Sequence, residues 1–260
     1  MGAQVRSPYV GEIIELPPGR QTRLYSVMPY YQGYTLESRL LRQPPVSLEE
    51  GTAIGITLAK AVYALNRLRI IHRDIKPDNV MLEATPSRYT AESETSGWTL
   101  KLLDLGVARL PGIQHGVDED IPGTPSYMAP ELFDGEAGDE RSDVYALGVT
   151  LYRMFSAGQY PYGEVEPFSR PRFNKRTPLT RHRPDLPAWL DAIMTRATSI
   201  DANDRYADAM ELAFELENGL MRGAKAQPAR LSWYDRNPLR FWQVVSLLLA
   251  LALMVSLALR

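Results

Sequence analysis

Apolar residues recur at helical spacing in three stretches of the chain. The first follows Ser47, which forms a capping-box pattern with Glu50, so that each side chain can bond the backbone N–H of the other. The apolar positions after it predict a helix with one buried face: Ile54, Leu58, Ala61, Val62, Leu65 and Leu68. Two more helices are expected near residues 187–198 and 206–220, the latter with one face made of Tyr206, Met210, Ala213 and Phe214.

A fourth stretch, residues 143–152, is apolar nearly all round, which predicts a helix buried at the centre of a domain. Near the N-terminus, residues 10–16 and 22–28 have the composition of strands, and the Pro-Pro-Gly sequence between them indicates a turn. We therefore expect a hairpin followed by helices, which makes an α+β fold that is mainly helical.

The C-terminal stretch differs from the rest of the chain. Residues 241–259 carry no charge, and as a helix they would extend roughly 28 Å, which is enough to cross a bilayer. The alternative, a buried terminal helix of the domain, stays open. The linker before it, residues 223–240, is predominantly basic, and such a bias holds its side of a membrane helix in the cytoplasm. The sequence thus predicts a single-pass protein of the inner (cytoplasmic) membrane, with 241–259 in the lipid bilayer.

Composition excludes several classes of function. The 260 residues include no cysteine, which rules out disulfides, thiolate catalysis and cysteine metal sites. A net charge of −2 and a pI near 6.0 give no sign of a nucleic-acid partner.

Residues 70–80 contain the closest grouping of side chains that are suited to catalysis. Within six residues they bring together the carboxylate of Asp74, the ammonium group of Lys76 and the carboxamide of Asn79, flanked by apolar residues that can pin them to a core. These groups suit the handling of a hydroxyl, a phosphate and a metal ion. Further along, Leu-Leu-Asp104-Leu-Gly106 and Gly-Thr124-Pro-Ser-Tyr-Met-Ala-Pro-Glu131 follow in that order.

In this order, the three motifs resemble the catalytic loop, the metal-binding strand end and the end of the activation segment of bacterial-type Ser/Thr protein kinases. The resemblance assigns residues 1–31 to a remnant of the smaller lobe with its hinge, and 32–222 to the larger, C-terminal lobe. It implies ATP and Mg²⁺ as cofactors and a protein Ser or Thr as acceptor. With its C-terminal membrane helix, the chain is also similar to the kinase half of bifunctional phosphatase–kinase proteins.

The resemblance gives the motif residues their expected roles. Asp74 would orient the acceptor hydroxyl and take its proton, Lys76 would stabilise the transferring phosphoryl group, and Thr124 would contact both. Asn79 and Asp104 would bind Mg²⁺.

Other residues would bind adenine or support the site. Met28 would be the gatekeeper, and the Pro29 carbonyl and the Tyr31 N–H would bond adenine at the hinge. Met81 would form the floor of that pocket, although plain core is an equally good interpretation. The supporting residues would be His72 and Arg73 of the loop, Gly106 at a sharp turn, Asp143 holding the loop backbone, and Glu131 paired with Arg205.

One departure from the family bears on activity. The Gly-rich loop, the strand lysine and the helix glutamate that grip the phosphates in kinases do not occur in these 260 residues. A fragment, a wrongly assigned start and a true loss of the smaller lobe are all compatible with this pattern. The alternative function is therefore a membrane-anchored pseudokinase that binds partners without catalysis. The oligomeric state and the protein substrate are not predicted.

Two charged segments have open interpretations. Residues 118–120 are Asp-Glu-Asp where kinases are often phosphorylated, so they could replace a phosphate by pairing with Arg73, or form a solvated loop. Residues 167–184 contain six Lys or Arg and no acid, and could contact acidic substrate segments or anionic lipid, or be simply solvated. Residues 84–98 are Ser/Thr-rich and are expected to form an exposed insertion.

Overall fold

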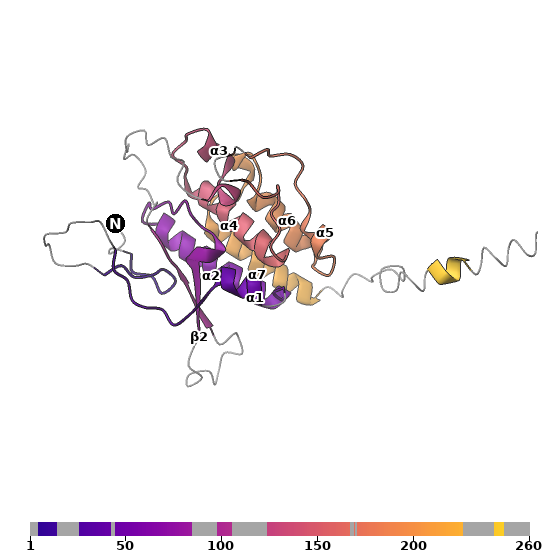
Figure 1. Ribbon diagram of the computed structural model, residues 1–260, viewed down its shortest axis with the longest axis horizontal. Coiled ribbons are helices and arrows are strands. Elements are labelled where there is room, and N and C mark those ends of the chain that lie inside the picture. Colours follow the sequence, from indigo (N-terminus) through magenta and orange to yellow (C-terminus); the bar gives the residue numbers. More distant parts are fainter. Residues whose placement is uncertain are drawn as a thin grey trace, which may run out of the picture. The chain divides into compact units, whose positions relative to one another are not determined.

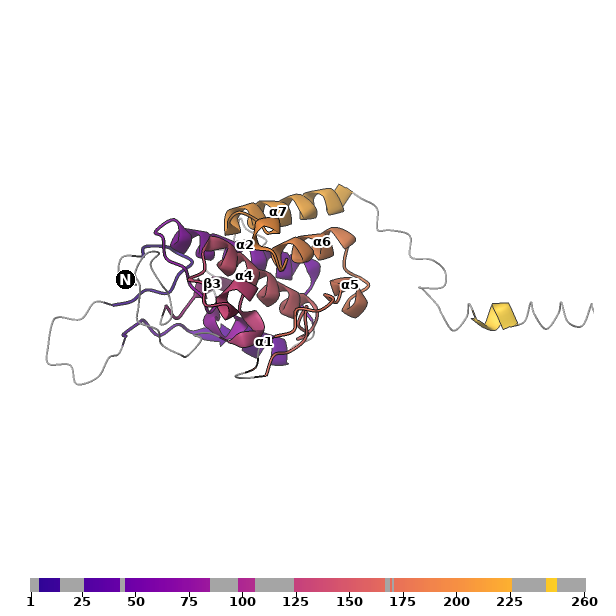
Figure 2. The same ribbon diagram turned by 90° about the horizontal axis from the view of Figure 1, so that it is seen from above.

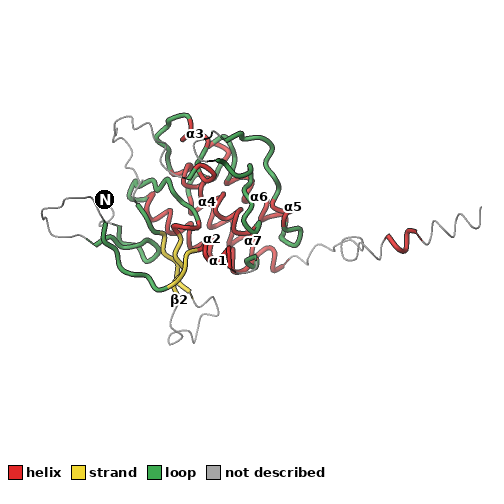
Figure 3. The backbone as a smooth tube through the Cα atoms, in the orientation of Figure 1, coloured by secondary structure: helices red, strands yellow, loops and turns green. Residues whose placement is uncertain are grey.

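The computed structural model describes residues 5–14, 26–42, 45–84, 98–105, 124–166, 169, 171–225 and 242–246. The chain divides into two units, residues 1–220 and 221–260. In the first unit, a small sheet lies at one side of a mostly helical body, in agreement with the expected fold class (Figures 1 and 3). Its elements, including the short 3-10 helices labelled η, are β1 (Gly33–Thr35), α1 (Leu36–Arg42), α2 (Leu48–Asn66), η2 (Pro77–Asn79), β2 (Val80–Ala84), β3 (Trp98–Leu102), η3 (Pro125–Tyr127), α3 (Pro130–Phe133), α4 (Glu140–Phe155), α5 (Leu179–His182), α6 (Ala188–Ala197), η4 (Ala202–Asp204) and α7 (Ala209–Lys225).

Helix α4 lies at the centre of this unit, as its all-round apolar sequence predicts. Every residue from 142 to 152 is buried. Helix α6 approaches it closely at Gly148, where an added Cβ would lie 2.8 Å from the Cβ of Ala197. Seen from above, α7 covers the outer side of α2 and α6 (Figure 2). The helices therefore stack around α4, and the same core includes buried residues of the strands, such as Leu82 and Leu100.

Helix α2 follows its prediction with two exceptions. The Ser47 hydroxyl accepts a hydrogen bond from the Glu50 N–H at 3.1 Å, but the Glu50 carboxylate pairs with Arg39 at 2.9 Å, so only half of the capping box forms. The second exception is Leu68, which was expected in the buried face and is 48% exposed. The helix ends at Asn66, and the backbone then turns through Arg69 at a φ of 58°, which takes Leu68 away from the core.

Helix α7 starts later than expected, and this changes its buried face. Tyr206 is buried but precedes the helix, whose first residue is Ala209. The predicted core position Phe214 is wrong, since this side chain is 59% exposed. With the observed start, the residues that reach the core are Ala209, Leu212, Ala213 and Leu216.

The sheet has the order β1-β2-β3, and both pairings are antiparallel. Segment 5–14 joins its far edge, because Leu102 exchanges backbone hydrogen bonds of 2.8 Å with Tyr9 and Gly11. The expected N-terminal hairpin appears only as a single antiparallel bridge between Ile14 and Val27. The described parts of both segments otherwise contain no regular strand, and the turn between them lies outside the described residues.

In the second unit, the structure describes the last residues of α7 and residues 242–246, which are helical. No helix in the described part of the chain has the length and apolar character to span a membrane. The remainder of the predicted span 241–259, and the predicted linker from residue 226 onward, lie outside the described residues.

Candidate active site

A carboxylate of α4 holds the backbone of the loop that carries Asp74. Asp143 is fully buried, and its two oxygens accept hydrogen bonds from the backbone N–H groups of His72, at 2.9 Å, and Arg73, at 3.0 Å. The Asn66 amide at the end of α2 donates a third, at 2.9 Å. The contact expected between Asp143 and the loop backbone is therefore present. Burial raises the pKa of Asp143, and these three N–H donors oppose that rise.

A second residue of α4 holds the same loop. The Thr150 hydroxyl donates to the Ile75 carbonyl at 3.2 Å. Thr150 lies seven residues after Asp143 and so on the same helix face. Neither Thr150 nor Asn66 was expected from the sequence. Their signal is the occurrence of isolated polar residues at helical spacing within or beside an apolar face.

His72 links the loop to the strand end that carries Asp104. Its Nε2 lies 3.1 Å from the Leu103 carbonyl, and its Nδ1 accepts from the Asp74 N–H at 3.3 Å. A neutral ring with its proton on Nε2 satisfies both contacts. In addition, the Leu103 N–H donates to the Asn79 carbonyl at 2.8 Å. The two predicted motifs are thus tied together by backbone and ring contacts.

Arg73 adopts a left-handed backbone conformation with a φ of 69°. Its side chain is buried, and one guanidinium nitrogen donates to the Ala137 carbonyl before α4. The proposed partner, the acidic run 118–120, lies outside the described residues, so that pairing stays a prediction.

Asp74, Lys76 and Thr124 meet in one cluster. The Lys76 ammonium group lies 2.8 Å from Asp74 Oδ2 and donates to the Thr124 hydroxyl at 2.8 Å. That hydroxyl donates to Asp74 Oδ1 at 3.3 Å. Thr124 comes from a segment 50 residues away in sequence, and its approach to both loop residues was expected. The cluster places a carboxylate and a cation side by side around a hydroxyl.

Asn79 is oriented by the same carboxylate. Its side-chain N–H group donates to the Asp74 carbonyl at 2.7 Å and to Asp74 Oδ2 at 2.9 Å. Because the amide nitrogen is used in this way, the amide oxygen is the atom that can accept a metal ion.

Asp104, the other predicted metal ligand, follows Leu103 directly and is exposed, with a φ of 64°. Asp tolerates this left-handed conformation better than most residues. An amide and a carboxylate oxygen fit the preference of Mg²⁺ for hard ligands. Gly106 lies outside the described residues, as does the predicted insertion between residues 84 and 98, and no cluster of three or more His, Cys, Asp or Glu suited to a metal occurs in the part that is described.

The predicted adenine-binding residues are only partly brought together. Pro29 and Tyr31 line a cavity of about 840 Å³ beside segment 5–14. The Tyr31 hydroxyl accepts from the Glu12 N–H at 2.8 Å, which ties the predicted hinge to that segment. Met28, which is 41% exposed, and Met81, which lies on β2 opposite Thr35 and Lys101, do not line this cavity.

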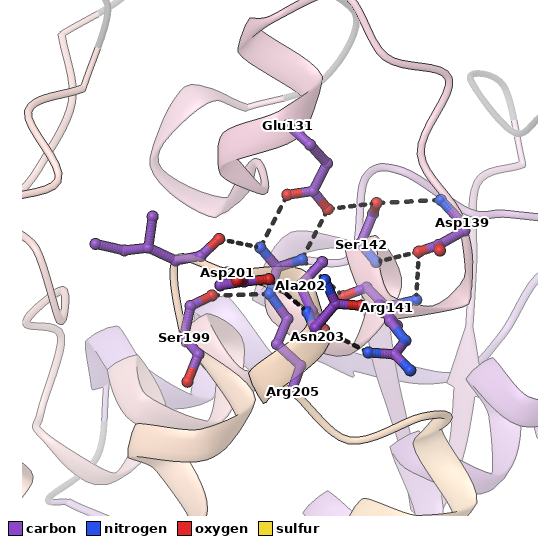
Figure 4. A network of polar contacts seen from close by, with 10 residues as sticks. Glu131, Asp139, Arg141, Ser142, Ser199, Asp201, Ala202, Asn203 and Arg205 are labelled. Carbon is purple, nitrogen blue, oxygen red and sulfur yellow. Dashed lines mark hydrogen bonds and ion pairs between the residues drawn. The ribbon is translucent and has the colours of Figure 1, made fainter.

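The predicted ion pair between Glu131 and Arg205 is present (Figure 4). Two parallel hydrogen bonds of 2.7 and 2.8 Å join the groups, and the Arg205 side chain is fully buried. The Ser142 hydroxyl donates to the same carboxylate at 2.7 Å. Burial acts to raise the pKa of Glu131, but the hydrogen bonds from Arg205 and Ser142 hold it below its ordinary value. The pair fixes the end of the segment that begins at Thr124 onto the helical core.

The basic stretch 167–184 is not uniformly solvated. Arg176 pairs with Asp191 at 3.0 Å, and Arg183 pairs with Asp185 at 2.7 Å, both with acids just beyond the stretch. Arg170 lies outside the described residues. These partners were not expected, because both acids lie outside residues 167–184.

Comparisons with known proteins agree with the geometry. The protein kinase domain family matches residues 2–211. The chain is 30% identical over 222 residues to the Ser/Thr-protein kinase PknK of Mycobacterium bovis, covering 84% of this chain and 19% of the relative. It is 30% identical over 232 residues to PknD of Chlamydia abortus, covering 79% of this chain and 24% of the relative. The chain thus spans about a fifth to a quarter of the length of these relatives.

Among solved structures, the PknI kinase domain of Mycobacterium tuberculosis is similar, with a TM-score of 0.61 and 27% identity. The match covers 84% of this chain and 74% of that domain. Because the family match spans most of the sequence and the motif residues converge as described, the chain belongs to the bacterial-type Ser/Thr branch of the protein kinase family.

Proposed function

We propose that this chain supplies the acceptor side of an active site that transfers the γ-phosphoryl group of ATP to a Ser or Thr of a protein. The observation that carries the proposal is the cluster in which Lys76 contacts both Asp74 and Thr124. The proposal is supported because alignment of an incoming hydroxyl requires a proton acceptor and a positive charge side by side.

Phosphoryl transfer requires mainly that the acceptor hydroxyl is positioned and that the negative charge on the phosphates is neutralised. The acceptor oxygen forms a bond to the γ-phosphorus, the bond to the bridging oxygen of ADP breaks, and the hydroxyl proton passes to Asp74. Lys76 offsets the negative charge of the transferred group. Thr124 holds the segment that begins with it against the loop through its contacts with Lys76 and Asp74.

Asn79 and Asp104 are the residues that would hold Mg²⁺. When bound, the ion would neutralise charge on the phosphates of the nucleotide. Asn79 is suited to this role because its amide nitrogen donates to Asp74, which leaves the amide oxygen free of that carboxylate and available to a metal ion.

The test is transfer of labelled phosphate from Mg·ATP to the purified chain. Replacement of Asp74 by Asn should lower the rate by at least roughly 100-fold, since general base catalysis has that size. Asp78→Asn is the matched control, because Asp78 is an exposed carboxylate in the same loop. Equal rates for wild type and Asp74→Asn would refute the proposal.

A second candidate function is a scaffold that binds partners without catalysis. It is favoured by the absence, from these 260 residues, of the Gly-rich loop and strand lysine that grip phosphates in the family. A wild-type signal no higher than that of Asp74→Asn, in a chain that remains folded, would leave this alternative.

We also propose that residues 241–259 anchor the protein in the inner membrane with the kinase lobe in the cytoplasm. The uncharged run and the basic linker before it support this placement. The full chain should stay in the membrane pellet after extraction with alkaline carbonate. A chain truncated after residue 240 should be released, and equal behaviour of the two would contradict an anchor.

A further inference from the structure

The turn formed by Thr124 and η3, residues 124–127 and here called the acceptor turn, is held at both of its ends. Thr124 is the N-cap of η3, and the Tyr127 N–H donates to the Thr124 carbonyl at 2.9 Å. One end contacts Asp74 and Lys76 through Thr124. The other end is Tyr127, which is only 3% exposed. A shift of Tyr127 therefore moves Thr124 relative to the catalytic loop.

Tyr127 is held by Arg153, which lies in the last turn of α4. One guanidinium nitrogen of Arg153 donates to the Tyr127 hydroxyl at 3.0 Å, and the guanidinium group lies 5.3 Å from the ring centre of Tyr160. Burial raises the pKa of Tyr127, so its hydroxyl stays neutral and can accept this bond. The positively charged Arg153 thus donates a hydrogen bond to the neutral, buried hydroxyl of Tyr127.

Glu37 of α1 completes the arrangement. Both of its carboxylate oxygens accept from the guanidinium group of Arg153, one of them at 2.8 Å, and the two side chains are only 15% and 17% exposed. A bidentate pair fixes the orientation of an arginine better than a single bond does. Helix α1 also contacts η2, the 3-10 turn that contains Asn79. The same helix therefore touches the catalytic loop and, through Glu37 and Arg153, the acceptor turn.

We propose that Arg153 is a positioning residue for phosphoryl transfer: with Glu37 and Tyr127 it sets where the acceptor turn lies relative to Asp74. Arg153 does not touch the reacting groups and acts through η3. The inference rests on the proposed kinase function for its catalytic consequence, but the control of η3 by Arg153 is independent of it.

The test uses the full chain with Arg153→Met, Tyr127→Phe and a matched control, Arg196→Met. Arg196 is a suitable control because it also pairs with a glutamate, Glu211, and lies over a tyrosine ring, that of Tyr206, away from the acceptor turn. The first measurement is amide hydrogen exchange of residues 124–129 by mass spectrometry. Exchange there should accelerate roughly tenfold in Arg153→Met, by the loss of about one good hydrogen bond, and less in Tyr127→Phe.

The second measurement is kinetic. In Arg153→Met, the KM for a peptide acceptor should rise about 3- to 10-fold, whereas the KM for ATP should stay within about twofold. A general loss of structure would change both. In the double variant Glu37→Arg with Arg153→Glu, the two charges are swapped. If their pairing is what positions the turn, the KM for the peptide should lie closer to the wild-type value than it does in Arg153→Met.

The outcomes separate the two proposals. Unchanged exchange at residues 124–129 in both Arg153→Met and Tyr127→Phe, or the same acceleration in Arg196→Met, would overturn the positioning role. If Arg153→Met fails to fold, Tyr127→Phe decides, since it removes one hydroxyl and keeps the ring. A chain without phosphoryl transfer that still shows accelerated exchange would refute the proposed function and leave the control of η3 by Arg153 intact.

Discussion

Arg205 and Glu131 face each other through two parallel hydrogen bonds across 74 residues of sequence, with the arginine side chain fully buried. The guanidinium group also donates to the carbonyls of Ser199, Ile200 and Arg141, so it ties two backbone segments, residues 199–200 and Arg141, to Glu131 (Figure 4). A charge placed at this depth is stable only with all of its partners.

Replacement of Arg205 by Met should therefore destabilise the lobe strongly. The change leaves Glu131 without its counter-ion and three carbonyls without a donor, for which we expect a loss of about 3–5 kcal/mol in the free energy of unfolding. Urea denaturation followed by circular dichroism measures it. Arg196→Met serves as a control, since its half-exposed pair with Glu211 should be worth about 0–1 kcal/mol. Similar losses in the two variants would contradict the special role of the buried pair.

The same pair predicts a pH dependence. Because the pKa of Glu131 in the folded protein lies below the ordinary value of 4.5, its carboxylate stabilises the fold at pH values above 4.5. This contribution is lost as the pH falls through the lower, folded-state pKa. In urea midpoints measured from neutral pH downward, the gap between wild type and Glu131→Gln should therefore narrow in the acid range. A gap that stays constant or widens there would contradict the assignment.

Asp143→Asn should loosen the catalytic loop. Asn offers one acceptor oxygen in place of two and turns an NH₂ group toward the backbone donors of His72 or Arg73. We expect the free energy of unfolding to fall by about 2–3 kcal/mol, which is the size of a hydrogen bond to a charged group. Chemical denaturation checks this value, and hydrogen exchange should accelerate across residues 72–75. Asp201→Asn, at an exposed cap, should change neither quantity appreciably.

Gly148→Ala should destabilise the contact of α4 with α6. The new methyl group would lie 2.8 Å from the Cβ of Ala197, closer than carbon atoms approach in folded proteins. Such overpacking costs about 1–3 kcal/mol. The double variant Gly148→Ala with Ala197→Gly should recover part of this loss in thermal unfolding, and a double variant less stable than either single one would argue against a steric cause.

Much of the larger lobe could be predicted from local patterns. The periodicity after Ser47 located α2, and the apolar run 143–152 located the buried centre of α4. The spacing of Asp74, Lys76 and Asn79 is informative because the chemistry requires all three side chains on one short loop. Thr124, Glu131 and Arg205 followed from the family resemblance, and their contacts agree with it.

Other features of the fold and of the site depend on tertiary contacts, which cannot be predicted from the spacing of apolar residues along the chain. Leu68 and Phe214 occupy apolar positions at helical spacing, but one lies past the end of α2 and the other on the outer face of α7. Glu50 pairs with Arg39 of another helix in preference to its own N-cap. Arg153 looks like an ordinary charged residue at a helix end until Glu37 and Tyr127 are placed beside it.

The most direct measurement is a crystal structure of the chain with Mg²⁺ and a non-hydrolysable ATP analogue. We expect a metal ion bound by the Asn79 amide oxygen and the Asp104 carboxylate at about 2.1 Å, with the terminal phosphate toward Lys76 and Asp74. A nucleotide bound elsewhere, or a metal ion that touches neither Asn79 nor Asp104, would contradict it.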